Sequence, residues 1–190
     1  MRWMLFVDGE NLTMREQEVA KQENLLLEGD SQHYLKDVFV WCPGVPALTP
    51  YYLLLEQPRF RDYPATRAYY YTSLVGDYPK VDEVRGHLRA LGFDPQVFKK
   101  LAGKSKGVDI TLTKDMLAHA FEHHYDMAML FAGDRDYVPL IEEVKRRGKN
   151  VYVSFFAGAE HGLATEVQLV ADLFFDLTPA FLRKWQGARR

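Results

Sequence analysis

Short apolar runs alternate with helix-patterned segments along most of the chain, and this alternation sets the expected architecture. The runs at 1–7 and 127–131 have the length and apolar content of buried strands. The runs at 67–72, 96–99 and 150–156 read as further strands, and 174–177 reads as a short edge strand. The segments at 80–91, 110–123, 140–147 and 165–172 read as helices, and a terminal helix starts at Pro179. This order predicts an α/β fold: a doubly wound, mostly parallel sheet of about five to six strands with helices on both faces.

Residues 13–65 interrupt the pattern. A polar helical stretch at 15–27 is followed by segments that are broken by prolines and rich in aromatic side chains. We interpret residues 13–65 as a long insertion or an elaborated crossover within a single domain that spans 1–190. A lid that contacts the substrate is the alternative, because aromatic rings stack on nucleobases as well as fill cores.

Aspartates stand where the apolar runs end. Asp8 closes the first run and is followed by Asn11, while Asp134 and Asp136 follow the run at 127–131. Parallel sheets place ligands outside the carboxyl ends of their strands, and clustered carboxylates repel one another unless a cation or proton lies between them. Hard cations such as Mg²⁺ and Mn²⁺ prefer oxygen ligands, so one interpretation is a metal site. The other is a set of solvated turn or helix-capping aspartates.

Two further aspartates belong to the helix expected at 110–123. Asp109 opens this helix, where a carboxylate either caps free amides or faces the same pocket. Asp115 comes six residues later, which at roughly 100° per residue places it about 120° around the helix. We therefore expect Asp109 to be a direct metal ligand and Asp115 to support it or to serve a second cation.

Composition and charge permit a polyanionic partner without demanding one. The formal net charge is −2, yet basic residues cluster at 99–106, 145–149 and 183–190. Lys106 lies in a glycine-containing loop and is a candidate phosphate contact. The single cysteine, Cys42, allows no intrachain disulfide and favours a reducing cytoplasm. No apolar run approaches transmembrane length, so we expect a cytoplasmic protein without a membrane partner.

A second metal motif competes with the aspartates. Residues 119–123 match H-x-x-E-H, the inverted zinc-protease signature, with His119 and His123 four apart on one helical face. The pair is expected just before a strand begins, at the opposite edge of the sheet from the aspartates. Histidines exposed near a helix end are the plainer interpretation.

Taken together, the acidic motifs resemble the NYN domain family of PIN-like nucleases. The resemblance covers residues 3–12 and about 66–178, and the segment 169–174 is also similar to the closing helix and strand of that family. It is carried by four motifs in order: Phe6 to Leu12, Lys106 to Ile110, Asp115, and Ala132 to Tyr137.

The resemblance implies a Rossmann-like PIN fold and a hydrolase that cuts RNA phosphodiester bonds with Mg²⁺ or Mn²⁺. A bound cation would lower the pKa of water and offset charge on the leaving oxygen. The implied metal-binding set is Asp8, Asp109, Asp134 and Asp136, with Asn11 and Asp115 supporting catalysis and with Asn11, Lys106 and Arg135 contacting the substrate.

Two departures from the family pattern bear on activity. Ala132 stands where Ser or Thr is usual, and Arg135 stands where a small residue is more usual. Arg135 would either bind phosphate or pair with the neighbouring carboxylates and weaken metal binding. The alternative to a ribonuclease is therefore a catalytically weak or inactive NYN module that binds RNA or a protein partner, with a zinc hydrolase third. DNA stays open as a substrate because no residue can be assigned to a 2′-hydroxyl, and homodimerisation through the insertion stays open as well.

Overall fold

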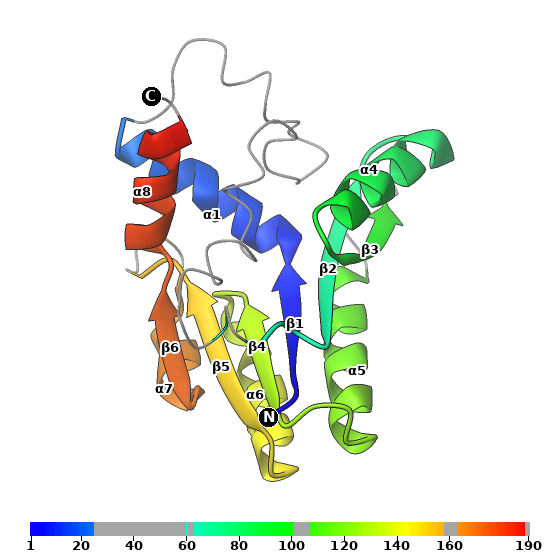
Figure 1. Cartoon of the computed structure of the whole chain (residues 1–190), viewed down its shortest axis with the longest axis vertical. Coiled ribbons are helices and arrows are strands. Elements are labelled where there is room, and N and C mark those ends of the chain that lie inside the picture. Colours follow the sequence, from blue (N-terminus) through cyan, green and yellow to red (C-terminus); the bar gives the residue numbers. More distant parts are fainter. Residues whose placement is uncertain (25–59, 61–62, 101–106, 158–162, 189–190) are drawn as a thin grey trace.

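The computed structural model describes residues 1–24, 60, 63–100, 107–157 and 163–188 (Figure 1). Within these ranges six strands form one sheet in the order β3-β2-β1-β4-β5-β6, and every neighbouring pair is parallel. The predicted α/β architecture is confirmed, with a fully parallel sheet. The strands are β1 (Trp3–Asp8), β2 (Arg67–Leu74), β3 (Asp94–Lys99), β4 (Met127–Phe131), β5 (Asn150–Phe155) and β6 (Leu173–Asp176).

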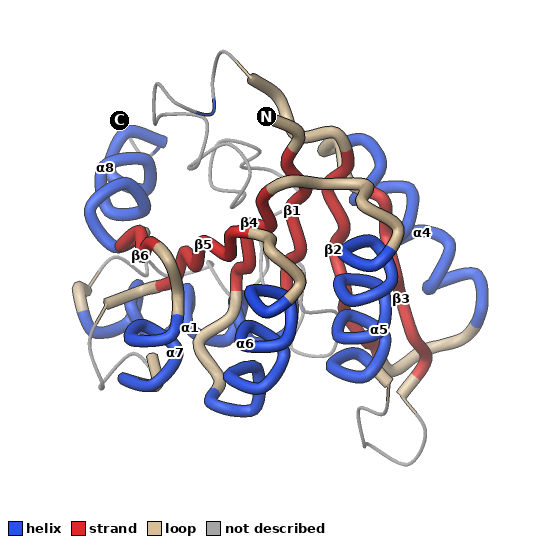
Figure 2. Tube along the Cα trace, turned by 90° about the horizontal axis from the view of Figure 1, so that it is seen from below, coloured by secondary structure: helices blue, strands red, loops and turns tan. Residues whose placement is uncertain are grey.

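Helices cover both faces of this sheet (Figure 2). Residues of α1, α4 and α8 pack with one face, and residues of α5, α6 and α7 pack with the other. None of the described helices is long and apolar enough to cross a membrane. The helices are α1 (Gly9–Gln22), α4 (Tyr78–Ala90), α5 (Val108–Phe121), the 3₁₀ turn η3 (Arg135–Tyr137), α6 (Val138–Arg146), α7 (Thr165–Val170) and α8 (Thr178–Ala188).

The first strand lies at the centre of the sheet and is buried along its whole length. Trp3, Leu5 and Val7 belong to the core on the α1 side, while Met4 and Phe6 belong to the core on the α5 side. A strand buried on both faces requires a continuous apolar sequence, which explains why the strand could be predicted from residues 1–7. The strand order reverses between β1 and β4, and in such sheets the crevice at this reversal is where ligands bind.

The segment after β1 differs from the sequence-based expectation. The helix α1 begins at Gly9, directly after the strand, rather than at residue 15, and it includes residues 13–22. The reason is that Asp8 caps the helix: its side chain accepts a hydrogen bond from the Asn11 amide. Residues 25–59 and 61–62 of the expected insertion lie outside the described residues, so its structure stays a prediction.

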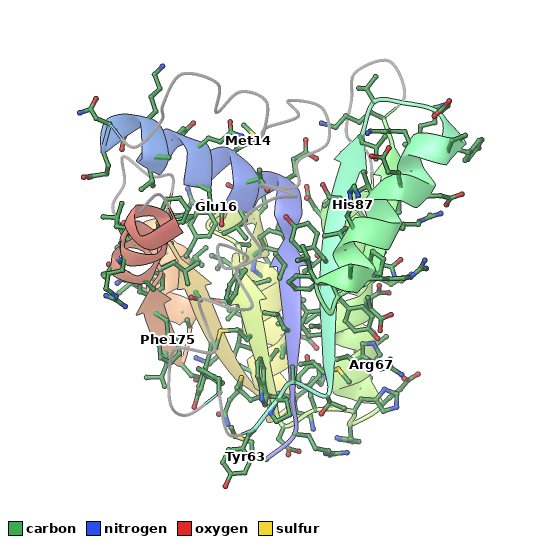
Figure 3. The ribbon with its side chains drawn as sticks, turned by 45° about the horizontal axis from the view of Figure 1, so that its top comes forward. Met14, Glu16, Tyr63, Arg67, His87 and Phe175 are labelled. Carbon is green, nitrogen blue, oxygen red and sulfur yellow. The ribbon has the colours of Figure 1, made fainter. Side chains whose placement is uncertain are left out.

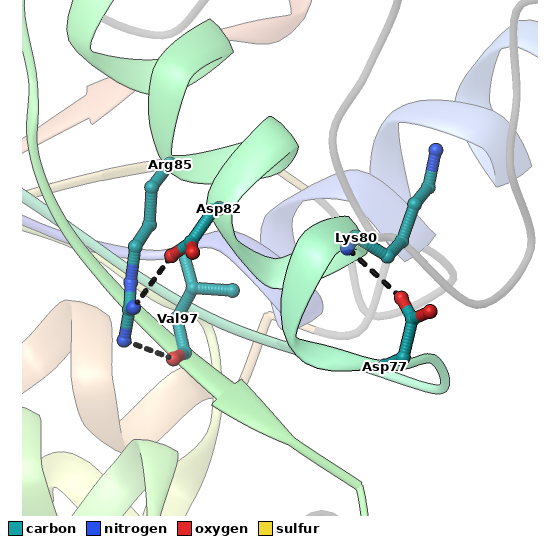
Figure 4. A network of polar contacts seen from close by, with 5 residues as sticks. All are labelled: Asp77, Lys80, Asp82, Arg85 and Val97. Atoms are coloured by element: carbon teal, nitrogen blue, oxygen red, sulfur yellow. Dashed lines mark hydrogen bonds and ion pairs between the residues drawn. The ribbon is translucent and has the colours of Figure 1, made fainter.

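Polar contacts fasten α4 to the edge strand β3 (Figure 4). Asp77 caps the helix by accepting a hydrogen bond from the Lys80 amide at 3.0 Å. Arg85 donates to Asp82 at 3.1 Å and to the carbonyl of Val97 on β3 at 3.3 Å. The bond to Val97 joins the helix to the sheet, and Val81, Val84 and Leu88 are the buried residues of the helix.

A matched pair of glycine substitutions tests the close approach of α1 to β2. A Cβ atom at Gly9 would lie 1.9 Å from Cε1 of the buried Tyr70 ring, whereas a Cβ atom at Gly86 in α4 would meet nothing within 4 Å. We expect Gly9→Ala to lower the free energy of unfolding by about 1–3 kcal/mol through overpacking. Gly86→Ala should raise it by about 0.5–1 kcal/mol, because alanine is the better helix former. Urea unfolding followed by circular dichroism measures both, and equal effects would contradict the packing described.

Candidate active site

A pocket of about 300 Å³ lies at the carboxyl ends of β1 and β4. Its three aspartates come from separate segments: Asp8 from the end of β1, Asp109 from the first turn of α5 and Asp134 from the turn after β4. Figure 3 labels Met14 at this edge of the sheet and Arg67 at the opposite edge. The described residues that line the pocket are Asp8, Glu10, Asn11, Met14, Arg15, Gly107, Val108, Asp109 and Asp134.

Asp8 is the buried member of this set, with only 3% of its surface exposed. One carboxylate oxygen accepts from the Asn11 amide at 3.0 Å, and the other accepts from the Tyr137 hydroxyl at 2.9 Å. The same hydroxyl lies 3.4 Å from Asp109 Oδ1. Asp8 therefore is both a helix cap and a wall of the pocket, so the two interpretations of its position in the sequence are compatible.

Tyr137 is a site residue for which we predicted no role from the sequence. Burial raises its pKa far above the usual range, with the charges of Asp8 and Asp109 adding to the effect, so its hydroxyl stays protonated and donates. It connects two of the three aspartates from the end of η3. The feature of the sequence that could have identified it is a tyrosine directly after an acidic turn. The ring of such a tyrosine can pack in the core while its hydroxyl reaches a carboxylate.

In the described part of the chain, four acidic residues and one basic residue, Arg15, line the pocket. Burial raises the pKa of Asp8 to about 7, against the lowering effect of hydrogen bonds from Asn11 and Tyr137. Desolvation also raises the pKa of Asp134; Arg15 lowers it and the charge of Asp109 raises it. Carboxylate oxygens are the ligands that Mg²⁺ and Mn²⁺ prefer, and a cation would relieve this repulsion. The donor set therefore fits a hard divalent cation.

Asn11 connects α1 to the turn that follows β4. Its side-chain oxygen accepts from the Gly133 amide at 3.1 Å, and its side chain also makes a hydrogen bond with Asp134 that lowers the pKa of that carboxyl. From the sequence we expected the Asn11 side chain to support catalysis and to contact the substrate. Its described contacts are those of a residue that positions Asp134.

Three of the described residues that the resemblance implies do not line the pocket: Asp115, Arg135 and Asp136. Asp136 is exposed on η3 and borders a separate hollow with Arg135. Asp115 accepts from the Tyr71 hydroxyl at 3.2 Å and lies 3.2 Å from Lys114 Nζ. Lys106 lies outside the described residues.

The two arginines near the pocket have different surroundings. Arg135 Nε lies 3.3 Å from Glu166 Oε1 on α7, and its side chain is 75% exposed, so it pairs away from the aspartates on either side of it in the sequence. Arg15 lines the pocket and is its one basic residue in the described part of the chain. Sequence reasoning missed Arg15, although it follows Asn11 by four residues and so shares a face of α1 with it.

The predicted arrangement of His119 and His123 is wrong. The helix α5 ends at Phe121, and His123 lies beyond it in the left-handed region with φ 56°. His119 Nδ1 instead lies 2.9 Å from Nδ1 of His124. The inverted zinc-protease motif requires both of its histidines on one helical face, and the structure does not provide that face.

Comparisons with known proteins agree with this architecture. A family model described as NYN domain matches residues 2–178. An uncharacterized protein of Methanocaldococcus jannaschii is 30% identical over 90 residues, which span 47% of this chain and only 34% of that relative. A crystal structure of a protein of unknown function from Vibrio parahaemolyticus superposes with a TM-score of 0.59 at 17% identity, covering 92% of this chain and 91% of the other, and shows the same fold.

The raised pKa of Asp8 predicts a pH-dependent effect of Asp8→Asn on stability in the absence of metal. Relative to the unfolded chain, the native state holds its Asp8 proton up to about pH 7, so the stability that Asp8 contributes is present below pH 3.8 and is lost as the pH rises through about 7. Asparagine keeps the capping oxygen and carries no charge. We expect the variant to be more stable than the wild type by about 2–4 kcal/mol at pH 8 and nearly equal at pH 3.5.

The measurement is urea unfolding in EDTA at both pH values. A difference between the two proteins that does not change with pH would contradict the account of Asp8.

Proposed function

We propose that this chain, which belongs to the NYN domain family of PIN-like nucleases, is a metal-dependent ribonuclease. One observation carries the proposal: three aspartates from three distant segments line one pocket at the reversal point of the sheet. A surface that only bound a polyanion would gain nothing from concentrated negative charge, because affinity for nucleic acid comes from cations. A pocket that recruits a divalent cation needs that charge.

In this proposal Asp8, Asp109 and Asp134 hold Mg²⁺ or Mn²⁺ through their carboxylate oxygens. The bound cation would lower the pKa of a water molecule toward neutrality and offset charge on the leaving oxygen. The protein contributes rigid placement of the donors: Tyr137 holds Asp8 beside Asp109, and Asn11 holds Asp134 to the start of α1. Because the pKa of Asp8 is about 7, cation binding at neutral pH also displaces its proton.

Arg15 is the proposed contact for the scissile phosphate. Its guanidinium lies on the wall of the pocket, and arginine binds phosphate through paired N–H donors. Arg15 also pairs with Glu18 on the same helix, with Nη1 2.5 Å from Oε2, so a phosphate would compete with that carboxylate. Arg135 pairs with Glu166 and does not line the pocket, which makes it the weaker candidate. A phosphate contact by Lys106, which lies outside the described residues, stays a prediction from the sequence.

Two matched pairs of substitutions test the carboxylates. Asp109→Asn and Asp134→Asn should each reduce cleavage of end-labelled single-stranded RNA by more than about 100-fold, since even groups that only orient metal ligands typically cost 10–100-fold. Asp115→Asn on the same helix and Asp136→Asn in the same turn should keep most of the activity, because neither lines the pocket. The assay compares Mg²⁺, Mn²⁺, Zn²⁺ and EDTA and includes a DNA substrate.

Cleavage that survives Asp109→Asn and Asp134→Asn would contradict the assignment of the site. If the wild type binds RNA but cuts neither RNA nor DNA with any cation, the chain is the inactive binding module, a result that would fit Ala132 in place of the usual hydroxyl residue.

A second pair separates the arginines. Arg15→Ala should raise the KM for RNA by about tenfold, the loss expected for one hydrogen bond to a charged group, whereas Arg135→Ala should change it much less. Steady-state kinetics over a range of RNA concentrations gives both values. A larger effect from Arg135→Ala would assign the phosphate contact to that residue instead.

A further inference from the structure

We propose that His119, Glu122 and His124 form a second metal site that binds a late first-row divalent cation such as Zn²⁺. One ligand atom from each residue lies within 4.8 Å of the other two. His119 is in the last turn of α5, ten residues after Asp109, which corresponds to about 15 Å along the helix. The proposed site is therefore separate from the acidic pocket and lies at the opposite edge of the sheet.

The backbone at the end of α5 creates this cluster. His123 has a positive φ of 56° at the position where helices commonly end in glycine. Its amide donates to the carbonyl of Ala120 at 3.2 Å, and the His124 amide donates to the carbonyl of His119 at 3.0 Å. This pair of bonds is the Schellman motif, which reverses the chain and returns residue 124 to the side of residue 119.

The distances between the candidate ligand atoms suit a metal ion. His119 Nδ1 and His124 Nδ1 are 2.9 Å apart, and His124 Nδ1 lies 3.3 Å from Glu122 Oε2. Ligands about 2.0–2.1 Å from a cation lie about 2.9 Å apart at right angles and about 3.3 Å apart in a tetrahedron. Both separations therefore fall in the range for neighbouring ligands of one ion, although His119 and His124 now share a hydrogen bond that a cation would replace.

The ring of His119 is already oriented for coordination through Nδ1. Its Nε2 lies 3.1 Å from the Tyr69 hydroxyl, and the two rings stack with their centroids 5.4 Å apart. Metal-bound histidines typically donate their second ring N–H to such a partner, which fixes the tautomer and the ring plane.

The donor types select the cation. Imidazole nitrogens suit Zn²⁺, Ni²⁺, Co²⁺ and Cu²⁺, whereas Mg²⁺ prefers oxygen ligands alone. Glu122 and His124 are exposed, so a cation reaches them from solvent and water completes its coordination. The chain would then carry two sites of different chemistry at the two ends of α5.

Zinc titration by isothermal calorimetry tests the proposal on the full chain carrying Asp109→Asn and Asp134→Asn, which removes competition from the acidic pocket. We expect zinc to bind, and His119→Gln and His124→Gln each to weaken binding by about tenfold or more. The control His123→Asn changes the intervening histidine to a residue that tolerates positive φ and should leave the affinity unchanged. Circular dichroism of each variant verifies that it is folded.

Three results would overturn the proposal. The first is the absence of zinc binding, and the second is binding that neither His119→Gln nor His124→Gln weakens. The third is a loss in His123→Asn as large as in His124→Gln, which would assign the site to His119 and His123 instead. None of these results bears on the acidic pocket, whose function is tested by RNA cleavage.

Discussion

A carboxylate buried at the end of the central strand is the constraint on which the site depends. Asp8 has to be satisfied inside the protein, and it accepts hydrogen bonds from the start of α1 and from Tyr137. These bonds fix three segments relative to one another: the strand end, the first helix and the turn that follows β4. They do not offset the cost of burying the charge, because the pKa remains raised to about 7. The fold thus prepares a position that a cation would complete.

The topology of the sheet explains why such distant residues meet. Because β1 and β4 are neighbours where the strand order reverses, the Asn11 side chain accepts a hydrogen bond from the Gly133 amide, although the two residues are 122 positions apart in the sequence. Asp109 joins them from the first turn of α5, where the helix dipole also favours a negative group. Proximity to helix N-termini reduces the electrostatic cost of bringing the carboxylates together, and a bound cation would reduce the cost that remains.

Much of the fold could be predicted from the sequence because its central strands, β1 and β4, are buried on both faces. Runs such as Trp3 to Val7 and Met127 to Phe131 are continuous and apolar, and the aspartates that follow them end in the crevice. The direction in which individual side chains point could not be predicted from the sequence. Asp134 and Asp136 are one residue apart, but they flank the start of a 3₁₀ turn with three residues per turn, so only the first faces the pocket. Glu16 is typical of a polar helix surface by its sequence context, yet it is fully buried, and burial raises its pKa. The prediction that His119 and His123 share a helical face was wrong because the helix ends at Phe121.

The most direct measurement of the central claim is a crystal structure of the wild-type chain soaked in Mn²⁺, with an anomalous difference map calculated at a wavelength where manganese scatters. The account predicts a manganese peak bound by Asp8, Asp109 and Asp134, with Tyr137 still bonded to Asp8. A map without a peak in this pocket, or with manganese bound instead at Asp115 or Asp136, would contradict it.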